Sequence, residues 1–170
     1  MMHNVRFAGA VLGAFLLSTS NGLACGDKLL VIGRGVRFQN AKQPANIVIY
    51  SDGPQSRAIL GSAKLQNTLK LAGHKIQIIE GASQLDEVLK SGRVDVILIG
   101  LADIAGITRL IQSAPSKPAI LPILVKPSKA ELASAQRAYK FALNASDDGT
   151  QYLIVIDEAM KARLRISAKA

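Results

Sequence analysis

Residues 95–100, DVILIG, form an almost wholly aliphatic run near the middle of the chain. Such a run is typical of a central parallel strand, because helices cover both of its faces and polar alternation is not needed. Three further runs with strand-like composition, bounded by residues that favour turns, lie at 47–50, 75–80 and 118–125. We therefore predict four strands here, the last of them bent or placed near an edge by Pro122.

Helical periodicity fills the intervals between these runs. Apolar residues recur at three- and four-residue steps, with a glycine stop at Gly73, an approximate capping box from Ser83, and a capping box of Ser128 with Glu131. The segment 151–166 fits a strand or a helix, and its many helix formers favour the helix. The other helices that we expect span residues 58–72, 83–92, 104–114 and 129–144.

Strand and helix alternate from residue 46 to residue 144, which predicts an α/β fold. We expect an open parallel sheet of four to five strands with helices on both faces, followed by C-terminal helices. In such sheets the loops after the strands share one rim, and ligands bind there. The loops in question are 51–55, 81–83, 100–106 and 126–128.

The rim is the predicted binding site for a protein partner or a small anionic ligand. Backbone amides at Asp52, Gly53 and Gly100 could bind an anion, and Arg57 or Lys126 could supply positive charge. Asp103 completes the set of candidate ligand-binding residues, although a loop carboxylate is more often a turn or helix-cap residue.

Three motifs stand at this rim: Ser51-Asp52 after the first strand, the run 95–100, and Lys126-Pro127 after the fourth strand. With the element order from residue 47 to about 125, or more loosely to 144, they resemble a response-regulator receiver domain, which has a flavodoxin-like fold. In that family an acidic pair after the first strand holds magnesium, and an aspartate at the end of the third strand accepts phosphate.

The motifs also depart from that family. Only Asp52 remains of the acidic pair, Gly100 stands at the phosphoacceptor position, and the Lys-Pro pair follows the fourth strand instead of the fifth. Phosphoryl transfer to a carboxylate needs a hard divalent cation held by several oxygen ligands. The resemblance therefore implies a degenerate receiver-like domain that is not phosphorylated.

Other chemistries find little support in the residues. Ser51 or Ser56 could be imagined as a nucleophile with His74, but no nucleophile-elbow motif is present. His74 reads as a surface connector at the opposite end of the sheet. Cys25 and His74 are the only thiol and imidazole after residue 24, so we predict no metal site and no cofactor.

The N-terminus predicts export. Residues 1–24 follow the three-part plan of a secretory signal peptide: a basic start, an apolar run at 7–17, and a small, polar end. We divide the chain into this signal, a leader or edge strand at 25–45, and a single receiver-like domain at 46–170. Cys25, first after the cut, resembles the acylated cysteine of bacterial lipoproteins, although Gly22 departs from that pattern. A lipid anchor in the cell envelope and a soluble periplasmic product both remain open.

Composition narrows the function. Lys and Arg outnumber Asp and Glu by 21 to 12, but they are spread along the chain, and export makes nucleic acid an improbable partner. Aromatic residues make up only 4%, which disfavours a stacking platform. The leading hypothesis is a non-enzymatic exported binding module, in contact with a membrane only through a lipid on Cys25. The alternatives are a small envelope hydrolase or transferase with Asp52 or Asp103 as base, and a one-lobe periplasmic binding component.

Overall fold

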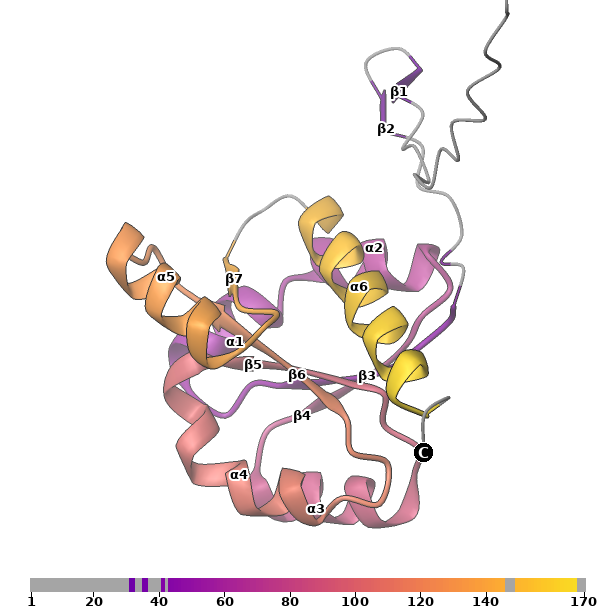
Figure 1. Cartoon of the computed structure of the whole chain (residues 1–170), viewed down its shortest axis with the longest axis vertical. Helices are drawn as coiled ribbons and strands as arrows, with labels where there is room; N and C mark the ends of the chain where they lie inside the picture. Colours follow the sequence, from indigo (N-terminus) through magenta and orange to yellow (C-terminus); the bar gives the residue numbers. More distant parts are fainter. Residues whose placement is uncertain (1–30, 33–34, 37–40, 42, 146–148, 168–170) are drawn as a thin grey trace, which may run out of the picture.

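The computed structural model describes residues 31–32, 35–36, 41, 43–145 and 149–167. The predicted signal at 1–24, the lipidation candidate Cys25 and most of the turn expected at 147–149 lie outside the described residues. The body of the fold is a sheet between two layers of helices (Figure 1). Within the described part, no helix is both long and apolar enough to cross a bilayer.

A five-stranded, wholly parallel sheet forms the centre of the fold. The spatial order is β4-β3-β5-β6-β7, which is the doubly wound order of flavodoxin-like folds. In the middle strand, Leu98 lies opposite Ile49 on one side and Leu121 on the other. The predicted open parallel sheet is therefore confirmed. Its strands are β3 (Asn46–Tyr50), β4 (Lys75–Ile79), β5 (Val96–Gly100), β6 (Ala119–Leu124) and β7 (Leu143–Asn144).

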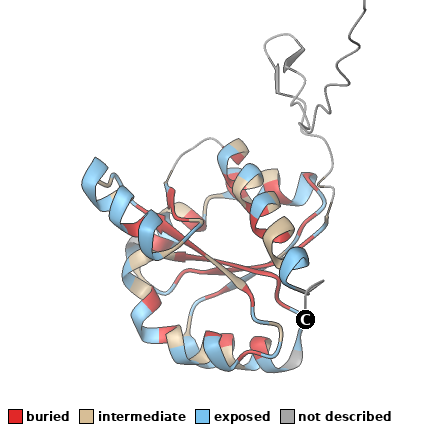
Figure 2. Ribbon diagram, viewed as in Figure 1, coloured by how far each residue is buried: buried red, intermediate tan, exposed pale blue. Residues whose placement is uncertain are grey.

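Helices cover both faces of this sheet, with α2 and α6 on one side and α3 and α4 on the other (Figure 1). Side chains of β3 alternate between two cores, since Ile47 and Ile49 join one cluster while Val48 and Tyr50 join the other. The inner strands of the sheet, at 46–50, 96–100 and 119–124, are mostly buried between the helix layers (Figure 2). The helices are α1 (Pro54–Leu60), α2 (Ala63–Leu71), α3 (Ala82–Ser91), the 3₁₀ turn η1 (Leu101–Asp103), α4 (Ile104–Ser113), α5 (Lys129–Ala138) and α6 (Gly149–Ser167).

The described part of the N-terminal leader forms a small sheet of its own. Its strand β1 (Val31–Ile32) pairs in antiparallel fashion with β2 (Gly35–Val36). Further along, the backbone amide of Ala41 donates to the Ala72 carbonyl just after α2, at 2.7 Å. In the described residues, the leader strands pair with each other and not with the five-stranded sheet.

The single helix expected over 58–72 is wrong, because the chain forms two helices there, α1 and α2. Pro54 begins α1 earlier than expected, and proline is well suited to the first turn of a helix. Gly61 ends α1 in a tight turn, where an added Cβ would lie 2.4 Å from the carbonyl oxygen of Arg57. The apolar periodicity continues through this break, since leucines of both helices enter the same core.

The helix expected over 129–144 is correct at its start and wrong beyond residue 138. The Ser128 hydroxyl accepts a hydrogen bond from the Glu131 amide at 3.2 Å, and the Glu131 carboxylate accepts one from the Ser128 amide at 2.7 Å, which completes the predicted capping box. Tyr139 is extended and ends the helix, and Leu143 then pairs with β6. Pairing with a distant strand thus overrides the local helical pattern.

Three remaining element predictions have mixed outcomes. The N-terminal cap at Ser83 is wrong, because α3 begins at Ala82 and its N-cap residue Gly81 makes no side-chain cap bond. The helix favoured for 151–166 is confirmed as α6. Pro122 lies opposite Ile99, outside the two β6 residues that pair with β7, so its predicted position near an edge is confirmed.

Candidate functional site

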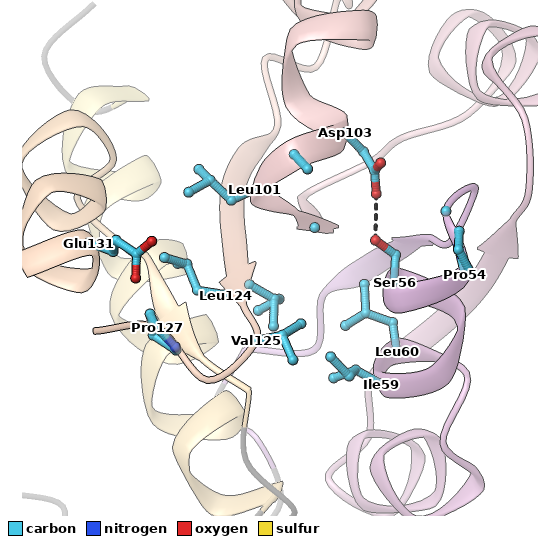
Figure 3. Close-up of a pocket in the computed structure, with 14 residues that line it drawn as sticks. Pro54, Ser56, Ile59, Leu60, Leu101, Asp103, Leu124, Val125, Pro127 and Glu131 are labelled. Carbon is cyan, nitrogen blue, oxygen red and sulfur yellow. Dashed lines mark hydrogen bonds between the residues drawn. The ribbon is translucent and has the colours of Figure 1, made fainter. Parts of the chain in front are cut away.

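The rim of the sheet carries a pocket of about 510 Å³ (Figure 3). It lies where β3, β5 and β6 end, between α1, the η1 turn and the start of α5. This volume falls within the range of small-ligand sites. Three of the four predicted rim loops contribute to it, whereas the loop 81–83 does not. The pocket is lined by Gly53, Pro54, Ser56, Ile59, Leu60, Gly100, Leu101, Ala102, Asp103, Ile123, Leu124, Val125, Pro127 and Glu131.

A short hydrogen bond joins two of the elements that line the pocket. The Ser56 hydroxyl, on α1, donates to Oδ2 of Asp103 at 2.5 Å (Figure 3). The two residues are 47 positions apart in the sequence, so only the parallel arrangement of β3 and β5 brings them together. Asp103 stands at the N-cap position of α4 but makes no side-chain cap bond there. Its carboxylate therefore faces Ser56 instead of serving as the helix cap suggested by its sequence position.

Gly100 makes this close approach feasible. A Cβ added to Gly100 would lie 2.2 Å from Oγ of Ser56 and 2.9 Å from Oδ2 of Asp103. A Cβ added to Gly53, on the other side of the same carboxylate, would lie 3.3 Å from Oδ1 of Asp103. The absence of a side chain at residue 100 thus leaves room for the hydrogen-bonded pair.

Most of the pocket wall is apolar. Val125 is 44% exposed, so the apolar surface of the pocket reaches the solvent at the rim. Leu60 and Ile123 are buried and connect the wall to the core beneath it. The aliphatic and proline side chains of the wall belong to Pro54, Ile59, Leu60, Leu101, Ile123, Leu124, Val125 and Pro127.

Glu131 contributes a second carboxylate to the pocket, from the first turn of α5. Asp103 and Glu131 lie on opposite sides of the pocket, with Leu101 and Leu124 between them (Figure 3). Hydrogen bonds from the Ser128 backbone amide, and then from its side chain, lower the pKa of Glu131. Glu131 is therefore ionised at neutral pH.

The structure brings three of the six predicted ligand-binding residues into the pocket, namely Gly53, Gly100 and Asp103. The other three lie outside its lining. Arg57 is exposed, with its guanidinium 3.9 Å from the Glu80 carboxylate. Neither of the two cations predicted as alternatives, Arg57 or Lys126, thus joins the rim amides in the lining of the pocket.

The remaining predicted residues, Asp52 and Lys126, are both exposed. Lys126 has a positive φ of 44°, in the left-handed region where the chain turns after β6. Asp52 accepts a hydrogen bond from the buried Tyr50 hydroxyl at 3.0 Å. Burial, then the bond to Asp52 and the negative charges of Asp52 and Asp103, raises the pKa of Tyr50 to about 12. The carboxylates of Asp52 and Asp103 thus both act on the Tyr50 hydroxyl at this side of the rim.

Ser56 and Glu131 line the same pocket, although the sequence pattern does not predict them as members of one site. Ser56 lies one residue beyond the predicted loop 51–55, and Glu131 was recognised only as part of a capping box. The capping box is itself a signal, because it fixes the first turn of α5 directly after the predicted rim loop 126–128. Their pairing with Asp103 across the pocket depends on the tertiary fold.

The pocket offers limited means for covalent catalysis. Ser56 donates to a carboxylate, while His74 precedes β4 at the opposite end of the parallel sheet, so the two cannot act together. Within the described residues, no three His, Cys, Asp or Glu side chains are placed to share a metal ion. What the pocket provides is an aliphatic surface with one carboxylate at each side.

No protein-family model matches the chain, and no curated protein matches it either. Among solved structures, the chain is similar to a de novo designed Rossmann 2x3 fold protein determined by solution NMR. The two share 17% sequence identity with a TM-score of 0.42, over 71% of this chain and 90% of the designed one.

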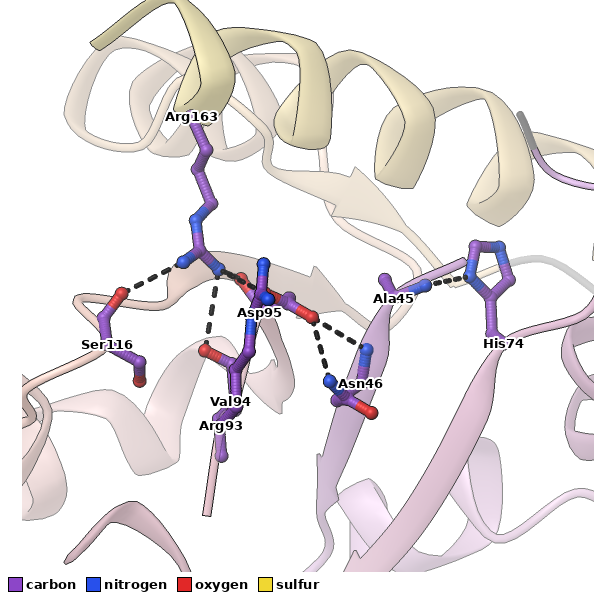
Figure 4. Close-up of polar contacts among 8 residues, drawn as sticks. All are labelled: Ala45, Asn46, His74, Arg93, Val94, Asp95, Ser116 and Arg163. Carbon is purple, nitrogen blue, oxygen red and sulfur yellow. Dashed lines mark hydrogen bonds and ion pairs between the residues drawn. The ribbon is translucent and has the colours of Figure 1, made fainter. Parts of the chain in front are cut away.

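The opposite end of the sheet, where the parallel strands begin, holds a polar network with a structural role (Figure 4). Asp95, only 2% exposed, accepts bonds from the amide of Asn46 at 3.0 Å and from its side chain at 3.1 Å. Arg163 of α6 donates to the Asp95 backbone carbonyl, to its carboxylate at 3.3 Å, and to the Ser116 carbonyl at 2.9 Å. This network ties the last helix to the ends of two strands.

His74 lies at the same end of the sheet, directly before β4, and is not the surface connector that the sequence suggested. It is 6% exposed, and its Nδ1 accepts a hydrogen bond from the Ala45 amide at 3.2 Å (Figure 4). Burial is the larger influence and lowers its pKa below the ordinary 6.5, while the charge of Asp157 partly opposes this. The neutral imidazole is thus the form that fits the fold.

His74 makes stability sensitive to mild acid. The unfolded chain takes up a proton on His74 near its ordinary pKa, whereas the folded chain resists protonation, so stability is full above that pKa and falls as the pH drops below it. Chemical denaturation between about pH 7.5 and 5.5 will show this loss. In His74→Asn, which keeps an acceptor near Nδ1 without titrating, the slope will be reduced. An identical slope in both proteins would contradict the assignment.

Proposed function

We propose that this protein is an exported, non-enzymatic binding module whose rim pocket receives a side chain of a protein partner. The observation that carries the proposal is the pocket, an aliphatic hollow at the carboxyl ends of β3, β5 and β6. Open α/β sheets bind their ligands beyond the carboxyl ends of the strands. A mainly apolar pocket with a few polar groups has the usual composition of a binding site.

The composition of the lining favours the protein partner over the small anion. An anionic ligand needs positive charge or directed amide groups, yet no Lys, Arg or His lines the pocket. Asp103 and Glu131 would instead repel an anion. Arg57 and Lys126, the cations considered for that role, lie outside the lining.

The same rim supports a receiver-like module that works without phosphorylation. Gly100 ends the third strand of the main sheet in chain order, where the receiver family carries its phosphoacceptor. A carboxylate at that position would collide with the bonded pair of Ser56 and Asp103. Asp52 and Asp103 alone are too few oxygen ligands for a hard divalent cation.

The enzymatic alternative lacks a complete set of groups. Asp103 accepts a hydrogen bond from the Ser56 hydroxyl at 2.5 Å. Asp52 is held by a hydrogen bond from Tyr50 and does not line the pocket. A carboxylate alone is a weak base for activating a hydroxyl, because its ordinary pKa lies far below that of the hydroxyl. Binding is therefore the simpler use of this arrangement.

Export and lipidation rest on residues 1–25. Mass measurement of the N-terminus of the protein purified from its own cells tests both. A chain beginning at Cys25, either free or with an added diacylglyceryl mass, supports export and decides between the soluble and the anchored form. A chain that retains residues 1–24 would contradict export.

Hexan-1-ol is a suitable probe for the pocket, because its alkyl chain imitates an aliphatic side chain. In NMR titrations of the isotope-labelled protein, we expect the largest amide shifts at Leu101, Ala102 and Val125. Ala102 is exposed and lines the pocket, so Ala102→Trp will fill part of it and abolish these shifts. Ala105→Trp is the matched control, since Ala105 is exposed on α4 outside the lining.

Two outcomes of this titration would contradict the proposed binding site. If hexan-1-ol shifts residues elsewhere, or binds Ala102→Trp as well as it binds the wild type and Ala105→Trp, then the rim pocket is not the binding site.

A further inference from the structure

We infer that the side chain received by the rim pocket is a lysine, so that the partner is recognised through one positive charge on an aliphatic stem. This inference rests on the proposed function and adds the chemistry of the occupant. It follows from the placement of charge in and around the pocket.

The charged residues that line the pocket have the opposite sign to the net charge of the chain. Over the whole sequence, 21 Lys and Arg residues face 12 Asp and Glu residues. Among the 14 residues drawn around the pocket, Asp103 and Glu131 are acidic and none is basic. A binding site of this sign on a basic protein selects a cationic group, because like charges at an interface are unfavourable.

Both carboxylates are available to such a group. Among the described residues, neither Asp103 nor Glu131 forms an ion pair with a Lys or Arg of the chain. Asp103 uses Oδ2 to accept from Ser56, but a carboxylate accepts up to about four hydrogen bonds, so it retains capacity. Glu131 is exposed and held in its position by the capping box.

The order of the groups around the pocket suits a lysine side chain. Leu101 and Leu124 lie between the two carboxylates (Figure 3) and offer aliphatic surface to the four methylene groups of a lysine stem. A carboxylate at each side, that of Asp103 partly exposed and that of Glu131 exposed, offers an ion-pair partner to the ammonium group. Exposed lining residues, including Pro54 and Val125, border the pocket and leave room for the backbone of a partner.

Three short peptides that differ in one side chain test the inference. They are acetyl-Leu-Lys-Leu-amide, acetyl-Leu-Gln-Leu-amide and acetyl-Leu-Glu-Leu-amide, titrated into the labelled protein by NMR. We expect the lysine peptide to bind about three- to fivefold more tightly than the glutamine peptide, as one partly exposed ion pair provides, and the glutamate peptide to bind most weakly. The preference will shrink in high salt.

Two double variants show where the preference arises. In Asp103→Asn with Glu131→Gln, which keeps both side-chain shapes and the capping acceptor, the lysine and glutamine peptides will bind equally. In Asp86→Asn with Glu87→Gln, which removes two charges from α3 outside the pocket, the preference will persist. Unchanged amide spectra away from the substituted residues will show that both variants are folded.

The outcomes separate this inference from the proposed function. Equal affinity of the lysine and glutamine peptides for the wild type would overturn the inference, while pocket shifts from hexan-1-ol would still support the binding site. Failure of both the peptides and hexan-1-ol to shift the pocket residues would overturn both. Hexylamine, tested alongside, will bind more weakly than the lysine peptide; tighter binding would assign the pocket to a small cationic amphiphile and overturn the protein partner.

Discussion

Replacing Arg163 by alanine is expected to lower the free energy of unfolding by about 3 kcal/mol, because it removes charged hydrogen bonds to buried acceptors. The Arg163 guanidinium bonds the Asp95 backbone carbonyl, the Asp95 carboxylate and the Ser116 carbonyl. Its side chain is only 22% exposed, and that of Asp95 only 3%, so water replaces these bonds poorly. Urea denaturation followed by circular dichroism measures the change.

Two further substitutions serve as controls for Arg163→Ala. Arg165→Ala removes an exposed cation from the same end of α6, and we expect a change within about 0.5 kcal/mol. Arg163→Lys keeps the charge but not the planar fork, so it will fall between the wild type and Arg163→Ala. Equal effects of Arg163→Ala and Arg165→Ala would contradict the idea that Arg163 fastens α6 to the sheet.

The second large effect is expected for Gly100→Ala, which should lower the free energy of unfolding by about 2 kcal/mol through overpacking. The new Cβ would lie 2.2 Å from the Ser56 hydroxyl and 2.9 Å from the Asp103 carboxylate. To relieve this contact Ser56 must rotate away, which breaks its bond to Asp103 and leaves a buried hydroxyl unpaired. Equilibrium denaturation of the purified variant gives the magnitude.

A double-mutant cycle with Ser56→Ala identifies the source of that loss. Without the hydroxyl, the Ser56 Cβ would lie 3.5 Å from the new Cβ, which is an ordinary contact. The Asp103 carboxylate, no longer bonded to Ser56, can then turn away from its 2.9 Å contact with the new Cβ, so Gly100→Ala should cost less than half as much in the Ser56→Ala background. Gly106→Ala is the matched control, since nothing lies within 4 Å of the added Cβ and alanine favours the helix. Independent, additive effects of Ser56→Ala and Gly100→Ala would show that the close contact does not explain the glycine.

The close packing of Ser56 and Asp103 around Gly100 bears on the proposed function. Residue 100 stands at the end of a buried strand, and the space beside it holds Ser56 and Asp103. The third strand therefore supplies room for a bonded pair that shapes one side of a pocket. We regard binding without phosphorylation as the use that best suits this arrangement.

The main features of the fold follow from local sequence. The run 96–100 is aliphatic at every position before its closing glycine, and it becomes the central strand buried on both faces. The helical stripe of 151–166 and the capping box at Ser128 likewise depend on neighbouring residues only, and the structure has both elements. Patterns of this range can be recognised before any tertiary contact is known.

The predictions that are wrong or incomplete concern positions where contacts with residues distant in the sequence determine the structure. Leu143 continues a helical pattern but pairs with β6. The sequence around His74 is typical of a surface connector, and only the fold places the Ala45 amide against its ring. The pocket is a similar case. Gly100 and Asp103 could be named from the end of the predicted strand, whereas Ser56 joins them only when β3 and β5 lie side by side.

The most direct measurement of the central claim is a set of intermolecular nuclear Overhauser effects between hexan-1-ol and the methyl groups of the protein. The rim pocket predicts contacts from the alkyl chain to the methyl groups of Leu101, Ile123 and Val125. Leu71 and Ile166 are more exposed apolar residues outside the pocket, at 75% and 70%, and they are the natural competitors. Contacts to these two residues, with none to the pocket methyl groups, would contradict the account.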